Sequence, residues 1–422
     1  MSATSDTGTQ DRSPNRARLL WLLIGIVACV VRIGFSSQIP PDREWGDAGI
    51  YDRVALNLLA GNGYSIDGVE PTRERPPAYP FFVATIYALT GRNLFAVIVV
   101  QSLLSILTVY LAASLASGVF DRRTSYVAAV LVATYPALIY YDTRFLREGP
   151  TALLVLLTVW ASWRAREGHI LDYLAVGASL AVISLCRPET GVLLFPAVLI
   201  VSNGLRPPAQ LIRPTLYILI PVVVGWLPWT VRNYQAFGSW SPVRTGVAST
   251  IWYGNRWAES GGDDQTQASR NQLKQEYFEK AGSKDNIEVE SKFSEHLADD
   301  LKNPLWLIRM TAKKAVLFWK DANGVKRTLP RIHPSLPILL NTYYYILLGL
   351  AVVAGWLGWK NRSVRLLLLT VATYAGIYAL LHVRNRYRVP LLPVVFILSA
   401  GGLTNLIGLL LSRYLYNNQT LT

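Results

Sequence analysis

The chain has 422 residues, of which 51% are hydrophobic and only 16% are charged. This balance excludes an ordinary soluble protein of that length. The formal net charge of +14 comes largely from arginines and lysines in short loops between apolar runs, and no basic stripe marks a soluble domain, which argues against nucleic-acid binding. The two cysteines, Cys29 and Cys186, both fall in apolar runs, so we expect buried thiols without a disulfide.

Apolar runs of roughly 20 residues, the length that crosses the hydrocarbon core of a bilayer, recur along the chain. They predict an all-α integral membrane protein with about ten transmembrane helices. The first run is expected not to be a cleaved signal peptide, because no small-residue cleavage site precedes Pro40-Pro41 and the hydrophobic part is too long. The runs lie at about 19–37, 93–119, 124–141, 150–163, 171–186, 190–205, 214–231, 336–358, 365–382 and 389–411.

Lysines and arginines in the short loops predict the orientation. If every run spans once, the basic clusters all fall on one side, which is then the cytoplasmic side and holds both termini. These clusters are Arg16/Arg18, Arg122/Arg123, Arg164/Arg166, Arg206/Arg213 and Lys360/Arg362/Arg365. The loops 38–92, 142–149 and 233–335 are then extracytoplasmic.

The first external loop, 38–92, has two predicted helices. Ile50, Val54 and Leu58 recur at helical spacing behind Asp47 and end at Gly61, which predicts a short amphipathic helix along the membrane interface. After Pro76-Pro77 a second apolar helix is expected at about 78–90. It is too short to span comfortably, so we place it among the lipid headgroups.

The loop 233–335 is the one sizeable extracytoplasmic piece, and we expect it to form a small, mainly helical region. Its opening stretch, from Phe237 to Gly262, is rich in Gly, Ser and Trp and is predicted to be irregular. Polar helices are predicted at about 265–281 and 287–301, and an amphipathic helix at 304–319 returns toward the membrane.

The interiors of the predicted spans carry almost no charge apart from Arg32. Ion-coupled transporters place charged coupling sites near the bilayer midplane, although each such charge costs about 2.5–3.5 kcal/mol on insertion scales. Here the acids and bases gather on the external loops instead. This pattern favours chemistry at the outer membrane surface over a path through the membrane.

The outward loops hold the candidate site residues. Three arginines within five residues, just before Pro390, break the usual charge bias and indicate an anionic group such as a lipid phosphate at the headgroup level. Each candidate also has a simpler interpretation: Asp47 as a helix N-cap, the acid–base pairs as surface ion pairs, and the arginine cluster as headgroup anchors. The candidates are Asp47, Glu74-Arg75, Arg147-Glu148, Arg187 with Glu189, and Arg384-Asn385-Arg386-Tyr387-Arg388.

Taken in order, these residues resemble the membrane glycosyltransferases of the GT-C class, in the bacterial branch with the protein O-mannosyltransferases and the lipid A aminoarabinose transferase. Asp47 with Tyr51 is similar to the Asp-x-x-x-Tyr of the first loop, and Arg73 to Pro80 is similar to its acid–base–Pro element. Further matches are Tyr141 to Glu148, Trp229 to Tyr234, Trp252-Tyr253-Gly254-Asn255, and Arg386-Tyr387-Arg388-Val389-Pro390.

The resemblance implies roles for these residues. Asp47 would be the catalytic carboxylate and Glu148 an acid that supports it. The donor phosphate would be held by Arg75, Arg187, Arg386 and Arg388, with Tyr51, Glu74, Tyr79 and Asn255 in supporting positions. No cofactor is required. A divalent metal is left open, with Glu74 as its candidate ligand, because the corresponding acid of the aminoarabinose enzyme helps to hold a metal ion.

The chain also departs from the family pattern. Many relatives carry a second acid directly after the first-loop aspartate, where this chain has Ala48. Some carry a large C-terminal extracytoplasmic domain that we do not expect here, so metal binding and acceptor recognition by such a domain are not carried over. The eukaryotic-type mannosyltransferase signature is weaker in this chain than the generic bacterial one, so the sugar is not assigned as mannose. We expect a cytoplasmic tail (1–15), a transmembrane catalytic module (16–232), an extracytoplasmic loop region (233–335) and C-terminal transmembrane helices (336–422).

The predicted function is hexosyl or pentosyl transfer from a polyprenyl-phosphate-linked donor to an extracytoplasmic glycan, lipid or protein, at a bacterial inner membrane. Asp47 would act as general base and arginines would stabilise the lipid phosphate. Two alternatives remain open at this point. One is a flippase or other transporter of lipid-linked sugars, and the other is a non-catalytic protein that binds the carrier lipid.

Overall fold

The computed structural model describes residues 14–38, 46–202, 207–241, 246–264, 266–281, 286–321 and 335–419. Throughout these ranges the protein is built of α-helices joined by short 3-10 helices and turns. The β pairing found there is one isolated antiparallel bridge between Ser65 and Pro71. The predicted all-α fold class is therefore confirmed.

Six of the described helices are long and apolar enough to cross a membrane, or seven if the bent pair of α5 (Arg122–Thr134) and α6 (Pro136–Asp142) forms one span. The six are α1 (Pro14–Gln38), α4 (Leu94–Val119), α10 (Pro208–Phe237), α15 (Leu336–Leu357), α16 (Arg362–Leu380) and α17 (Leu392–Gln419), the last entered through the 3-10 helix η6 (Asn385–Leu391). Shorter helices fill the remaining runs: α7 (Glu148–Arg164), α8 (Ile170–Cys186), and η2 (Pro188–Leu193) with α9 (Leu194–Val201). Each predicted run thus contains a helix, while the number of about ten spans stays a prediction.

Side-chain caps and glycine contacts fix how these helices begin and pack. Asn93 and Asp121 accept hydrogen bonds from the first-turn amides of α4 and α5. Gly177 of α8 lies so close to α10 that an added Cβ would be 2.1 Å from the carbonyl oxygen of Ile218. Small residues of this kind let helix backbones approach closely in membranes, where lipid removes most of the hydrophobic driving force for association.

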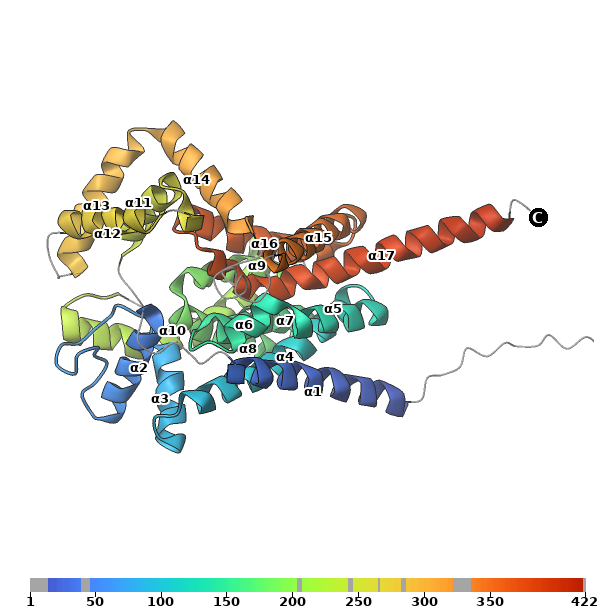
Figure 1. Ribbon diagram of the computed structural model, residues 1–422, viewed down its shortest axis with the longest axis horizontal. Helices are drawn as coiled ribbons and strands as arrows, with labels where there is room; N and C mark the ends of the chain where they lie inside the picture. The colour runs from blue at the N-terminus through green and yellow to red at the C-terminus, as the bar shows by residue number, and fades with distance from the viewer. Residues whose placement is uncertain are drawn as a thin grey trace, which may run out of the picture.

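The long helices run roughly side by side, with the start of α1 and the end of α17 at one end of the molecule (Figure 1). The helices of the two large external loops gather at the opposite end, α2 and α3 on one flank and α11 to α14 on the other. This arrangement agrees with the predicted topology, in which both termini share one side and the loops 38–92 and 233–335 share the other.

In the first external loop, α2 (Gly46–Leu59) and α3 (Ala78–Thr90) match the two predicted helices. Glu44 and Trp45, which precede Asp47, lie outside the described residues. Tyr51 of α2 and Tyr79 of α3 are fully buried and meet edge to face, with ring centroids 4.7 Å apart. This aromatic contact fixes α2 over α3 and so sets where Asp47 lies.

In the described residues of the loop 233–335, which is predicted to be external, four helices form what we call the external cap: α11 (Val247–Glu259), α12 (Gln267–Ala281), α13 (Asn286–Leu301) and α14 (Pro304–Trp319). The three polar and amphipathic helices were predicted correctly to within a few residues. The prediction that the stretch from Phe237 to Gly262 is irregular was wrong for α11, which is helical. Its low intrinsic helix propensity is overridden by packing, because Trp252 and Trp257 enter a small core with Phe293.

The external cap is attached to the end of α16 through polar contacts with backbone. The buried ammonium of Lys314 donates to the carbonyl oxygens of Leu380 (2.8 Å) and Leu381 (3.1 Å) and to Asn255 Oδ1 (2.8 Å). Gly254 lies against the same turn, where an added Cβ would be only 2.1 Å from the Leu381 oxygen. The end of α16 is therefore a docking point for both α11 and α14.

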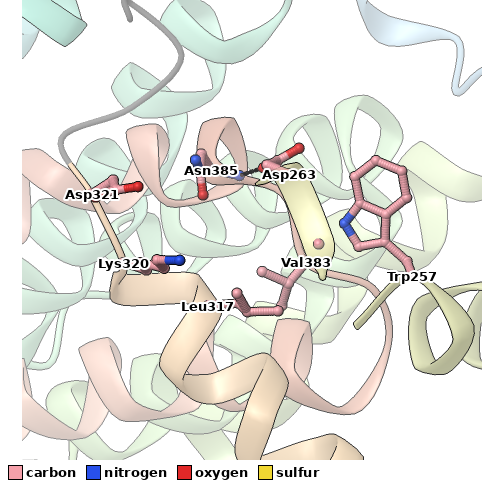
Figure 2. A pocket seen from close by; sticks show the side chains of 8 residues that line it. Trp257, Asp263, Leu317, Lys320, Asp321, Val383 and Asn385 are labelled. Carbon is pink, nitrogen blue, oxygen red and sulfur yellow. Dashed lines mark hydrogen bonds between the residues drawn. The ribbon is translucent and has the colours of Figure 1, made fainter. Parts of the chain in front are cut away.

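A third attachment reaches η6. A carboxylate oxygen of Asp263, which lies in the 3-10 turn η3 (Gly262–Asp264), accepts the backbone N–H of Asn385 at 2.8 Å (Figure 2). Asn385 is the first residue of η6, so Asp263 satisfies one of the amide groups that a helix leaves unpaired at its N-terminus. The next residue along η6 is Arg386.

Gly254→Ala is expected to loosen the external cap. The new methyl group would meet backbone rather than a flexible side chain, and overpacking of this kind costs about 1–3 kcal/mol. Thermal unfolding followed by tryptophan fluorescence should show a lower midpoint than wild type. The matched control is Gly376→Ala in α16, where nothing lies within 4 Å of the added Cβ. Equal midpoints for the two variants would contradict the close contact.

Asp263→Ala is expected to expose the N-terminus of η6. A hydrogen bond to a charged group contributes about 1.5–3 kcal/mol, so the amide of Asn385 should exchange with deuterium about tenfold faster or more. Hydrogen–deuterium exchange of peptides covering 383–391 measures this. Asp299→Ala removes an exposed acid that pairs with Lys302 and should leave those peptides unchanged. Unchanged exchange in Asp263→Ala would show that the cap does not hold η6.

Candidate active site

The structure places Asp47 between two arginines from distant parts of the chain. Arg75 donates from Nη2 (2.8 Å) and Nε (3.1 Å) to Asp47 Oδ1, and Arg386 donates from Nη2 to Asp47 Oδ2. Asp47 belongs to the first turn of α2, Arg75 precedes α3, and Arg386 lies in η6. Both carboxylate oxygens are therefore held by guanidinium groups, so helix capping is not what orients them.

The charges around Asp47 keep it ionised. Burial alone would raise the pKa of Asp47, but Arg386, Arg75 and Arg147 outweigh it and hold that pKa well below the ordinary value of 3.8. The Asp47 side chain is still 18% exposed, so it can be reached from outside. In this state it is an anion at neutral pH and a weak base, because its charge is shared with two cations.

Glu148 and Arg187 form a second, buried layer behind Asp47 and the two arginines that hold it. Glu148 begins α7, and its Oε1 lies 3.0 Å from Arg187 Nη2 and 3.5 Å from Arg386 Nε. Arg187 also donates to Tyr378 Oη at 2.9 Å, and that hydroxyl in turn donates to Glu189 Oε1 at 3.0 Å. Arg187 is thus not in a surface pair with Glu189. Its partner is Glu148, and Arg386 bridges the carboxylates of Glu148 and Asp47.

The arginines of this layer keep unused donors. The Nε atoms of Arg187 and Arg386 are buried and have no hydrogen-bond partner, and the same holds for Glu148 Oε2. Buried polar atoms are normally satisfied, so such exceptions mark places where a bound group would supply the missing partner. An anion with several oxygens, such as a phosphate, fits the two arginine donors.

Glu74 does not have the surroundings of a metal ligand. Its Oε1 lies 3.0 Å from Arg75 Nη1, and the side chain is about half exposed. A cation beside it would be repelled by Arg75. In the part of the chain that the structure describes, no group of three or more His, Cys, Asp or Glu side chains is arranged to hold a metal ion. Among the described residues, Asp47 and Glu74 are both paired with arginines and do not fit a bound metal.

Three other predicted site residues lie away from Asp47. Arg388 is fully buried and donates to the carbonyl oxygens of Phe318 (2.6 Å) and Lys320 (2.8 Å), with its guanidinium over the Tyr344 ring. Asn255 accepts from Lys314, inside the cap attachment. Tyr79 donates to Gln101 Oε1 at 2.6 Å and supports α2 through Tyr51. These contacts give Arg388 and Asn255 anchoring positions rather than contact with the carboxylate.

The sequence placed two further contributors to the cluster, Arg147 and Tyr387, among the candidates but gave them no role. Arg147 donates to the carbonyl oxygen of Cys186 at 2.6 Å and lies close enough to lower the pKa of Asp47. Tyr387 lies with its ring centroid 4.7 Å from the guanidinium carbon of Arg187. Tyr378, which accepts a hydrogen bond from Arg187, was not named from the sequence. It lies in an apolar helix, and the sequence gives no signal that separates it from an ordinary membrane-facing or core tyrosine.

Residues 74–229 match a family model described as dolichyl-phosphate-mannose-protein mannosyltransferase. No curated protein matches the sequence. Among solved structures, the chain is similar to the archaeal oligosaccharyltransferase AglB from Archaeoglobus fulgidus, with a TM-score of 0.54 and 13% identity over 95% of this chain and 51% of AglB. The chain thus spans about half the length of AglB.

Two structures of ArnT from Cupriavidus metallidurans are also similar, one bound to undecaprenyl phosphate and one in the apo state. Their TM-scores are 0.43 and 0.41, with 14% and 13% identity; they cover 93% and 92% of this chain and 78% and 77% of ArnT. The fold shared with AglB and the family match over 74–229 confirm the predicted resemblance: the protein has the architecture of the GT-C membrane glycosyltransferases.

Proposed function

We propose that the protein transfers a sugar from a polyprenyl-phosphate-linked donor to an acceptor on the extracytoplasmic side of a bacterial inner membrane. The observation that carries this proposal is the position of Asp47, a reachable carboxylate held between Arg75 and Arg386. One site thereby combines a base for the acceptor with cations for the leaving phosphate.

The donor class is supported by the arginines and by the comparisons. AglB is described in complex with a dolichol-phosphate, and the matching family model carries dolichyl-phosphate-mannose in its description. In this chain the buried Nε atoms of Arg187 and Arg386 have no hydrogen-bond partner, although Arg386 Nε lies 3.5 Å from Glu148 Oε1, and the Arg75 side chain is 20% exposed. A lipid phosphate would satisfy these donors while its chain stays in the bilayer.

The transfer is a single displacement. The oxygen of an acceptor hydroxyl attacks the anomeric carbon, the bond from that carbon to the phosphate oxygen breaks, and the bonding pair leaves with the polyprenyl phosphate. The hydroxyl proton passes to the Asp47 carboxylate. Arg75 and Arg386 stabilise the negative charge that grows on the phosphate, and the configuration at the anomeric carbon inverts.

Donor binding would also activate the base. In the absence of donor, the two arginines hold the pKa of Asp47 too low for efficient proton abstraction. A phosphate that takes up hydrogen bonds from the same guanidinium groups adds negative charge beside Asp47, which raises its pKa. The carboxylate therefore becomes a stronger base when the leaving group is in place.

Asp47→Asn is expected to lower transfer at least about 100-fold, the usual contribution of a general base, and Arg75→Ala to lower it by about 10²–10³. The measurement is sugar transfer in membrane vesicles, with a panel of radiolabelled polyprenyl-phosphate sugars. The matched control is Asp67→Asn, because Asp67 lies in an exposed turn of the same loop and an amide oxygen can still accept from Val69 and Glu70.

The same panel separates the alternatives. A flippase would move lipid-linked sugar across vesicles at a rate that Asp47→Asn leaves intact, with no sugar transferred. A non-catalytic carrier-binding protein would retain donor without consuming it. If no donor is consumed by wild type, or if Asp47→Asn consumes it as fast as wild type, the proposed function is wrong.

A further inference from the structure

A cavity of about 580 Å³ lies between the external cap and the outer ends of the spans. Its walls come from α11 and α12 on one side and from η2, the end of α16 and η6 on the other. This volume is within the range of roughly 300–1,000 Å³ that is typical of small-molecule sites.

The cavity adjoins the Asp47 cluster. Its lining includes Pro76, the neighbour of Arg75, and Tyr387, the neighbour of Arg386. It also includes Arg147, whose charge is one of those that lower the pKa of Asp47. A molecule in this cavity therefore lies beside both arginines that hold the carboxylate.

Six aromatic rings form a continuous track along the cavity. Neighbouring centroids along the track are 5.3–5.8 Å apart, which is within the range of direct ring contact. The track runs from the mouth of the cavity on α12 to the residue after Arg386 and then to Tyr378. In order, its members are Phe278, Tyr277, Tyr253, His382, Tyr387 and Tyr378.

Two members of this aromatic track have side-chain atoms that a ligand could contact. Phe278 is 69% exposed although it is a large apolar side chain, so its contact with Tyr277 leaves most of it uncovered. His382 Nδ1 is buried and has no hydrogen-bond partner. Burial, with Arg384 and Lys314, lowers the pKa of His382 well below its usual range, so the neutral ring offers a hydrogen bond to a ligand.

We propose that this cavity binds a saccharide and that the acceptor of the reaction is a glycan. The proposal rests on the proposed function. Sugar rings present C–H faces that pack on the negative faces of aromatic rings, and hydroxyl edges that bond to polar groups. The cavity offers both, because Ser249, Thr250 and Glu189 line it beside the aromatic track.

The walls argue against the other acceptor classes. An extended peptide is commonly recognised through an unpaired strand edge, but most of the lining here comes from helices, whose backbone groups are largely satisfied internally. An acyl chain would need a continuous aliphatic channel, whereas hydroxyl, imidazole and charged groups interrupt this lining. A saccharide uses the rings and the polar groups together.

Saccharide binding is testable without turnover. Purified protein in lipid nanodiscs is titrated with tetrasaccharides of mannose, glucose, galactose and arabinose, and binding is followed by saturation-transfer NMR. At least one tetrasaccharide should bind saturably, and Phe278→Ala should weaken its Kd tenfold or more. Phe278 is exposed, so its removal should leave folding intact. Trp240→Ala, an exposed aromatic of the same loop outside the cavity lining, should leave the Kd unchanged.

Competition with other ligands shows which substrate the cavity binds. If a polyprenyl-phosphate sugar binds together with the saccharide, the cavity is an acceptor site, as proposed. If it displaces the saccharide, the cavity holds the donor sugar and the acceptor assignment is overturned. The assignment is also overturned if only a threonine-containing hexapeptide or a lysophospholipid binds, or if Phe278→Ala binds like wild type. Donor consumption is measured in the same nanodiscs, so failure of the proposed function is seen separately from failure of saccharide binding.

Discussion

The candidate site depends on one ion-pair arrangement, the carboxylate of Asp47 held by Arg75 and Arg386. Asp47 and Arg386 come from opposite ends of the chain, since Arg386 follows Asp47 by 339 residues. A carboxylate at a wet surface would gain little from one arginine. Here burial raises the pKa of Asp47, but three nearby arginines outweigh that effect and depress the pKa. The same cluster of positive charge is what a lipid phosphate requires.

Most of the fold serves to bring these groups together. Tyr51 and Tyr79 fix α2 against α3 and so set the position of Asp47. Glu148, which also pairs with Arg187, lies against Arg386, and Asp263 accepts a hydrogen bond from the first amide of η6. Lys314 and Gly254 attach the external cap to the end of α16, immediately before that segment. The external cap is therefore part of the site rather than an appendage, since it also forms one wall of the cavity.

The sequence predicted the helices whose periodicity or boundaries are clear. Pro76-Pro77 marks the start of α3, and Gly61 marks the end of α2. The apolar runs located each long helix. The prediction from the sequence failed for α11, where Gly, Ser and Trp indicated a loop. Burial of Trp252 and Trp257 outweighs the local propensity there. The sequence also could not tell Arg386 from Arg388. Two residues apart on a short 3-10 helix, one reaches Asp47 and the other turns to the carbonyls that end α14, and only the tertiary packing decides between them.

The most direct test of the account is an electron cryo-microscopy structure of the protein with undecaprenyl phosphate in nanodiscs. The account predicts that the phosphate oxygens lie within hydrogen-bond distance of Arg75 and Arg386, and that at least one of these guanidinium groups has moved off Asp47. The lipid chain should pass between helices into the bilayer, with the cavity under the external cap left open. A phosphate bound elsewhere, for example at Arg388, or bound with both Asp47 contacts unchanged, would contradict the account.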